Sequence, residues 1–234
     1  MSLTKVTSLS FLLSCVLLAS HSAHALDVKI SKNLSRVKTA HDGKIISIQR
    51  IQDTDHMLTG GYTKTSRQCP PFCIQPMHVA PGVITVGELE VLEFIKHDLN
   101  QGTGVLIDAR TPSWFEKGTI PGSINIPFTS FDKDKSDLVK TSALAKLGVT
   151  LKTSADEPSV FDYVMDMMGE KKTAVNTKWN FSKAKHIMLW CNGMWCGQSP
   201  RAIKNLLALG YPAEKIYYFR GGMQTWKILG LTTK

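Results

Sequence analysis

One segment near the C-terminus combines the residue types that nucleophilic sulfur chemistry requires. It reads Cys191-Asn192-Gly193-Met194-Trp195-Cys196-Gly197-Gln198-Ser199-Pro200. Cys191 directly follows an apolar strand pattern, and the pair Ser199 and Pro200 is typical of a helix start. A loop at such a junction points backbone amides and the positive end of the helix dipole inward, which favours a thiolate and stabilises a bound oxyanion. The pattern therefore predicts a catalytic Cys191 in a loop from Asn192 to Gln198. A small buried cysteine is the alternative.

A second cysteine, Cys196, lies in the same loop, five residues after Cys191. One interpretation makes Cys196 a resolving thiol, which bridges Cys191 and intercepts its sulfenic acid before irreversible oxidation. The other makes it an inert part of the loop wall. A bridge requires the two Cα atoms to come within about 7 Å, and Gly193 lets the backbone bend between them. The spacing allows both interpretations.

Cys69 and Cys73 flank the sequence Pro70-Pro71-Phe72. Two prolines exclude a helix and favour a fixed turn. We expect a structural disulfide between these two cysteines. A metal site would need more ligands than this pair and His78, so we expect no metal and no cofactor.

Three apolar segments, residues 104–108, 186–190 and 216–219, predict buried strands. One helix is expected after a capping box formed by Thr85 and Glu88, and another from a Ser199 cap to Gly210. The expected apolar face of the first helix is Leu89, Leu92, Ile95 and Leu99. A short amphipathic piece is expected at residues 160–168. The alternation of strands and helices predicts a parallel sheet covered on both faces, with ligands at the carboxyl ends of its strands.

Residues 26–80 are predicted to form a small β-rich extension before the main domain. Two strand patterns, at 37–39 and 45–48, flank His41-Asp42-Gly43. Asp-Gly tolerates positive φ, so this sequence predicts a hairpin. The pattern changes near Pro81, where the strand–helix alternation of residues 81–234 begins.

From about Thr85 to Leu231 the chain resembles the rhodanese homology domain. The resemblance rests on several motifs in order: residues 106–112 (LIDARTP), residues 115–127 (FEKGTIPGSINIP), Gly210-Tyr211, Gly221-Gly222 and Trp226. It implies an α/β fold with a central parallel sheet and helices on both faces. It also implies that Cys191 accepts sulfane sulfur as a persulfide and passes it to a nucleophile. Asp108 and Arg110 are similar to the structural pair of the family.

The chain departs from the family pattern in its loop. Between the cysteine and the helix the loop is about two residues longer than usual, which leaves room for a larger ligand. It contains no Lys or Arg, whereas thiosulfate-using members often place a cation there. Only Arg201 is close in sequence and is a candidate for anion binding. Thr119 replaces a usual His, and we expect this change to lie at the surface.

The N-terminus has the pattern of a secretory signal peptide. Lys5 precedes an apolar run at 11–18, and Ala23-His24-Ala25 matches a signal-peptidase site. This run is too short for a membrane span. A lipoprotein box ending at Cys15 fits poorly, because the apolar run continues beyond it. We therefore expect residues 1–25 to be removed and the mature protein to be periplasmic or secreted, where disulfides persist.

The formal net charge is +9, with the basic residues scattered among acidic ones. No dense basic run interleaves with aromatic residues, so nucleic-acid binding has little support. No segment after the signal approaches the length of a membrane span. The basic surface is that of a soluble protein and favours the approach of small anions.

Together these patterns predict an exported rhodanese-type sulfurtransferase that carries a persulfide on Cys191. Its expected partners are a small sulfur-containing donor and a thiol or protein acceptor. The alternatives are a thiol–disulfide redox protein using Cys191 and Cys196, and a non-catalytic binding module, because fold alone does not decide function.

Overall fold

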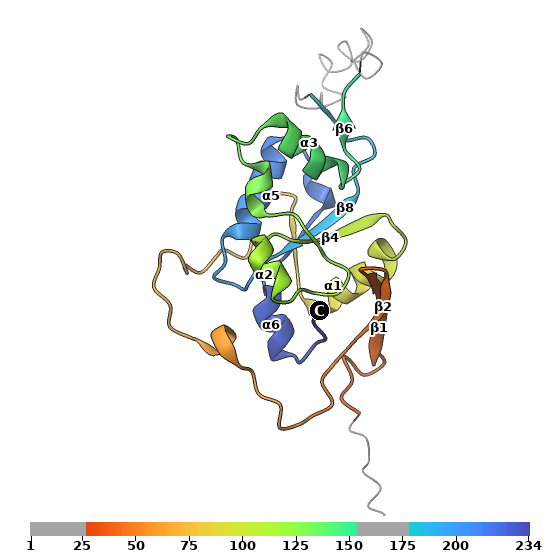
Figure 1. The fold of residues 1–234 in the computed structure, drawn as a ribbon, viewed down its shortest axis with the longest axis vertical. Coiled ribbons are helices and arrows are strands. Elements are labelled where there is room, and N and C mark those ends of the chain that lie inside the picture. The colour runs from red at the N-terminus through yellow and green to blue at the C-terminus, as the bar shows by residue number, and fades with distance from the viewer. Residues whose placement is uncertain (1–26, 154–177) are drawn as a thin grey trace, which may run out of the picture.

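A computed structural model describes residues 27–153 and 178–234 of the chain (Figure 1). The amphipathic piece expected at residues 160–168 lies outside the described residues. Within those ranges, no helix is long and apolar enough to cross a membrane.

Five parallel strands form the central sheet, in the order β3-β9-β8-β4-β5. Their bounds are β3 Ile84–Val86, β4 Gly104–Asp108, β5 Ile124–Asn125, β8 His186–Trp190 and β9 Ile216–Phe219. The central strands β4 and β8 are almost entirely buried, as expected for apolar strands covered on both faces. The predicted strands and the predicted parallel α/β sheet are confirmed.

Helices cover both faces of this sheet (Figure 1). On one face lie α3 (Asp137–Ala145) and α5 (Gln198–Ala208), which pack on inward residues such as Ile107 and Leu189. On the other face lie α1 (Glu88–Phe94), which continues as a π-helical turn through Ile95–Leu99, and α6 (Gly222–Ile228). The described chain also contains α2 (Pro112–Glu116), the 3-10 turns Gly60–Thr63, Phe128–Phe131 and Ala213–Lys215, and the short strand pair β6 (Thr150–Leu151) and β7 (Trp179–Asn180).

The predicted N-terminal hairpin is present as β1 (Arg36–His41) and β2 (Lys44–Gln49), paired antiparallel. Asp42 and Gly43 form its turn with φ of 47° and 73°, the positive values that Asp-Gly turns supply. From this hairpin, Val37 and Ile48 enter the hydrophobic core that also contains residues of α1 and α6. The hairpin therefore packs on the main domain.

Both predicted helix starts are wrong by a few residues. The first helix begins at Glu88, where the amide of Gly87 donates to Glu90 Oε2 at 3.0 Å. Thr85 instead belongs to β3, because its backbone is paired in the sheet. The expected face of this helix also shifts, since Leu89 is exposed while Val91 is buried.

The second helix begins at Gln198 with Gly197 at the cap position. Ser199 therefore lies inside the first helical turn, and its hydroxyl is fully buried. The expected Ser199 cap is wrong, and the residue faces the site instead of the helix end.

Candidate active site

Cys191 lies at the carboxyl end of β8, where the chain leaves the sheet toward α5. The start of α6 fixes its backbone: Met223 donates its amide to the Cys191 carbonyl at 2.9 Å, and Gln224 donates to the Asn192 carbonyl at 3.0 Å. Gly222 makes this approach possible. It has φ of 55°, and a Cβ there would lie 2.2 Å from the Cys191 carbonyl oxygen.

The surroundings of the Cys191 sulfur favour its ionised form. Burial would raise the pKa of Cys191, but hydrogen bonds from the Cys196 thiol, the Ser199 hydroxyl and the amides of Ser199 and Gly193 outweigh burial and lower it. The Ser199 hydroxyl is buried and makes no hydrogen bond to another group of the described chain, so it is free to donate to a charged sulfur on Cys191, whose pKa its proximity lowers. Donors to a thiolate lower its pKa in the same way as donors to a carboxylate. Cys191 is therefore poised as a nucleophile.

This environment predicts how the thiolate depends on pH. We expect its ultraviolet absorbance to persist in the folded protein below pH of about 8.5, where an ordinary cysteine is protonated. Because the folded pKa is the lower one, the thiolate adds stability above the unfolded pKa, and this contribution is lost as pH falls through the folded pKa. Both effects are measured by following the thiolate absorbance and the free energy of unfolding as functions of pH, in the native protein and in Cys191→Ser. A native thiolate signal that develops only in the ordinary range would contradict a lowered pKa.

The pair formed by Asp108 and Arg110 is buried directly behind the loop. Arg110 donates to both carboxylate oxygens of Asp108, through Nε at 2.8 Å and Nη2 at 2.6 Å. Its Nη2 also donates to the Gly118 carbonyl at 2.6 Å, and its Nη1 to Asn192 Oδ1 at 3.3 Å. The pair thus connects β4 to the first residue after Cys191.

Thr119 shares this cluster, so its expected surface position is wrong. It is buried and donates from Oγ1 to Asp108 Oδ2 at 3.0 Å. The short hydroxyl fits beside a carboxylate that is already bidentately bound by arginine.

Arg201 forms an ion pair with Asp132, and within the described chain its side chain makes no hydrogen bond or ion pair with the two loop cysteines. Its Nε and Nη2 donate to Asp132 at 2.9 and 2.6 Å, and its guanidinium lies over the ring of Phe128. Binding of an anion by Arg201 stays a prediction that would require this ion pair to open.

A segment of the N-terminal extension, residues 60–75, covers the active-site loop; we refer to it as the covering segment. Tyr62 donates its hydroxyl to Asn192 Oδ1 at 3.1 Å. At the other end, the Gln75 amide donates to the Met194 carbonyl at 2.8 Å. The covering segment is therefore hydrogen-bonded to both sides of the loop.

Aromatic contacts close the space between these hydrogen bonds. Phe72 meets the ring of Trp195 edge-on at 5.2 Å, and the Arg67 guanidinium lies over both rings, at 4.8 and 4.4 Å. Under this cover Cys191 is 2 % exposed and Cys196 is 5 % exposed. A molecule from solution therefore reaches the Cys191 sulfur only if the groups around it move.

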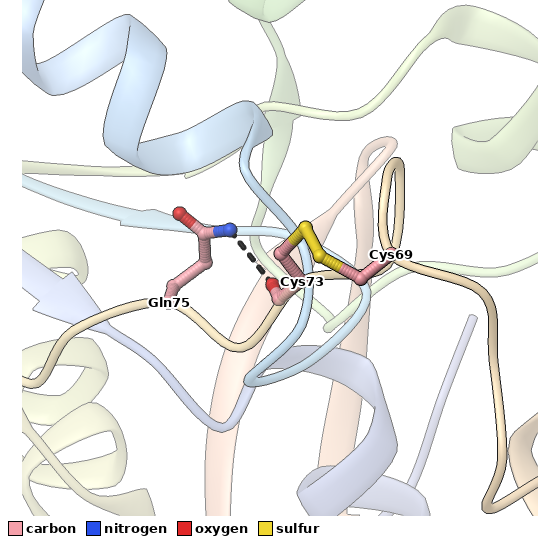
Figure 2. The surroundings of a disulfide bond; sticks show 3 residues. All are labelled: Cys69, Cys73 and Gln75. Carbon is pink, nitrogen blue, oxygen red and sulfur yellow. Dashed lines mark hydrogen bonds between the residues drawn. A yellow bond between two sulfur atoms is a disulfide. The ribbon is translucent and has the colours of Figure 1, made fainter.

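Cys69 and Cys73 form a disulfide within the covering segment (Figure 2). Gln75 donates its side-chain amide to the Cys73 carbonyl at 2.8 Å. Arg220, just after β9, donates to the Gln75 carbonyl at 2.8 and 3.1 Å. The bridge thus closes a short turn that is tied to the carboxyl edge of the sheet. No cluster of three or more candidate metal ligands occurs among the residues that the structure describes.

Sequence reasoning missed the residues that reach the loop from elsewhere in the chain. They are Tyr62, Arg67, Phe72 and Gln75 from the extension, and Gln224 from α6, whose Oε1 accepts from Trp195 Nε1. The fixed turn at the two prolines was the one available signal, and it does not say where the turn docks.

The family comparison agrees with this geometry. A family model described as a rhodanese-like domain matches residues 91–229, so the chain belongs to the rhodanese-like domain family. A comparison with curated protein sequences gave no match.

Similar solved structures include a human single-domain sulfurtransferase, with 22% identity, a TM-score of 0.34, and coverage of 62% of this chain and 95% of that one. A protein from Lactobacillus plantarum has 16% identity, a TM-score of 0.36, and coverage of 64% and 87%. A rhodanese_3-like domain from Anabaena has 16% identity, a TM-score of 0.29, and coverage of 56% and 97%.

Proposed function

We propose that this protein is a sulfurtransferase that carries sulfane sulfur as a persulfide on Cys191 and passes it to a thiol or another nucleophile. The observation that supports the proposal best is the position of the Cys191 sulfur. It lies at the carboxyl end of β8 beside the first turn of α5, where the neighbouring Ser199 hydroxyl and the amides of Gly193 and Ser199 lower the pKa of Cys191. These donors stabilise a thiolate, which is the attacking form of cysteine.

The transfer balances without a redox partner. The Cys191 thiolate attacks the outer sulfur of a donor R–S–SH, a new S–S bond forms on Cys191, and the donor leaves as the thiolate RS⁻. An acceptor thiolate then attacks the outer sulfur on Cys191 and restores the Cys191 thiolate. The donors that hold the resting thiolate also stabilise it as the leaving group of this second step.

We expect Cys191→Ser to abolish transfer of sulfur from an organic persulfide to an acceptor thiol, because the hydroxyl does not ionise in this site. Steady-state transfer by the native protein and the variant is the measurement. The matched control is the double variant Cys69→Ser/Cys73→Ser, which should still form the Cys191 adduct. Thiosulfate should be a poorer donor than the persulfide, since the loop at 191–198 contains no Lys or Arg. Full activity in Cys191→Ser would reject the assignment.

A thiol–disulfide redox protein is the second candidate, favoured by the position of two free cysteines on one turn of the loop, with the Cys191 sulfur 3.3 Å from the Cys196 carbonyl oxygen. It predicts that Cys196→Ala abolishes reduction of a model disulfide such as oxidised glutathione. The sulfurtransferase predicts that the same variant still accepts sulfur on Cys191.

Export completes the proposal. The signal pattern at residues 1–25 supports a mature chain that begins at Leu26. N-terminal sequencing of protein recovered outside the cytoplasm should read Leu-Asp-Val. A lipid-modified Cys15, or an intact Met1 on exported protein, would contradict it.

A further inference from the structure

Cys196 is a buried cysteine that the proposed sulfur transfer through Cys191 does not use. Both cysteines are free thiols in the structure. The Cys196 amide donates to the Gly193 carbonyl at 2.9 Å, so the loop turns back on itself. As a result the Cys191 thiol donates to the Cys196 carbonyl at 3.3 Å, while the Cys196 thiol donates to Gln198 Oε1 at 3.6 Å. The turn therefore brings the two buried cysteines side by side, and rotation of the Cys196 side chain away from Gln198 is the movement that a bond between them requires.

We propose that Cys196 resolves the Cys191 persulfide internally and releases the outer sulfur as hydrosulfide, so that the protein reduces sulfane sulfur. This inference rests on the proposed persulfide. The step is Cys191–S–S⁻ + Cys196–SH → Cys191–S–S–Cys196 + HS⁻. The Cys196 proton first moves to the outer sulfur, the resulting Cys196 thiolate bonds to the inner sulfur, and the S–S bond to the outer sulfur breaks. The sulfane sulfur gains two electrons, and the two cysteine sulfurs are oxidised to the disulfide.

The proton on Cys196 suits it to this step. Its hydrogen bond to Cys191, together with burial and the charge on Cys191, raises the pKa of Cys196 strongly. In the resting pair Cys196 is therefore protonated while Cys191 is ionised, so Cys196 brings a proton to the persulfide. A bare sulfide dianion is a poor leaving group; transfer of this proton to the outer sulfur lets hydrosulfide depart and leaves Cys196 as the attacking thiolate.

Burial favours an internal partner over an external one. The covering segment lies over the loop, and each thiol is at most 5 % exposed. An external thiol reaches the persulfide only if the buried loop opens, whereas Cys196 lies in the same loop, with its carbonyl oxygen 3.3 Å from the Cys191 sulfur. Turnover then requires an external dithiol that reduces the Cys191–Cys196 bridge when the covering segment opens.

The test uses the full mature chain. Cys191 and Cys196 are first reduced, and the reductant is then removed under anaerobic conditions. The chain is loaded with an organic persulfide and desalted. Released hydrosulfide is then measured, and the cysteine peptides are mapped without reduction. Cys196→Ser and Cys196→Ala are treated identically, which corrects for hydrosulfide released by the donor's own thiol. The double variant Cys69→Ser/Cys73→Ser should release the same final amount of hydrosulfide per chain as the native protein, because that pair is already oxidised and supplies no electrons; its rate is not compared, since the pair lies in the covering segment.

We expect one hydrosulfide per native chain, formed together with a Cys191–Cys196 linked peptide. Both Cys196 variants should keep the extra sulfur on Cys191 and release hydrosulfide only after a small thiol is added. A native protein that also keeps its persulfide would overturn the inference and leave the proposed function standing. Sulfur mapped to Cys196 would overturn it too, since that indicates relay between thiols. Absence of any adduct, in the native protein and the variants alike, would overturn both proposals.

Discussion

Asp108→Asn should lower the free energy of unfolding by about 3–5 kcal/mol, the usual cost of leaving one partner of a buried ion pair uncompensated. Asp108 and Arg110 have side-chain exposures of 0% and 1%. The carboxylate accepts two hydrogen bonds from the guanidinium and one from Thr119. Asparagine keeps the shape, but it removes the charge and turns one acceptor into a donor that faces Arg110. Denaturant titration of both proteins measures the loss.

The matched control is Glu93→Gln, which breaks an exposed pair with His97 at 3.0 Å. Exposed pairs contribute about 0–1 kcal/mol, so this change should be nearly neutral. We also expect Asp108→Asn to slow sulfur transfer, because Arg110 contacts Asn192 in the loop. Equal stability losses in the two variants would show that burial does not make the inner pair important.

Gly222→Ala should damage both the fold and the site. An alanine Cβ would lie 2.2 Å from the Cys191 carbonyl oxygen and 3.0 Å from the Gly193 amide nitrogen. Overpacking costs about 1–3 kcal/mol, and the φ of 55° adds the left-handed penalty of roughly 1–2 kcal/mol. Relief of the contact must move the Cys191 backbone, and misplacement of a reacting group by about 1 Å costs on the order of a hundredfold in rate.

Gly43→Ala separates crowding from the backbone penalty. Gly43 also has positive φ, at 73°, but nothing lies within 4 Å of a Cβ built there. Gly43→Ala should lower the stability only by the cost of the left-handed backbone conformation, and it should keep the native rate of sulfur transfer. If Gly222→Ala retained that rate as well, the close packing of α6 on Cys191 would not be needed for catalysis.

Much of the fold could be predicted from local sequence. The segments 104–108 and 186–190 are apolar without alternation, which is the pattern of strands buried on both faces. Asp42 and Gly43 supply the positive φ that a tight hairpin requires. The position of Cys191 follows from the same reasoning, since it needs only the end of a strand and the start of a helix.

The helix starts were less predictable because capping residues compete with tertiary structure. Thr85 is drawn into β3 by its pairing with β9, and Ser199 moves into the helix, where its hydroxyl meets the Cys191 sulfur. A cap signature reports what a residue can do locally, and both residues have stronger partners elsewhere in the fold.

The covering segment could not be predicted, because its contacts join residues far apart in the chain. Tyr62 reaches Asn192, and Phe72 packs on Trp195. Neither side chain belongs to a periodic pattern that would indicate a buried partner. These contacts lie over the loop that holds the buried Cys191. Because Cys191 is buried, an acceptor within the loop reaches its sulfur more easily than one from solution.

The most direct test of a persulfide on Cys191 is the mass of the intact mature protein before and after exposure to an organic persulfide. We expect a gain of one sulfur atom, located on the peptide that contains Cys191 and absent from Cys191→Ser. Where Cys196 resolves the adduct quickly, the gain should be read in Cys196→Ser, which traps it. An unchanged mass in Cys196→Ser, or sulfur located on a different residue, would contradict the proposed function.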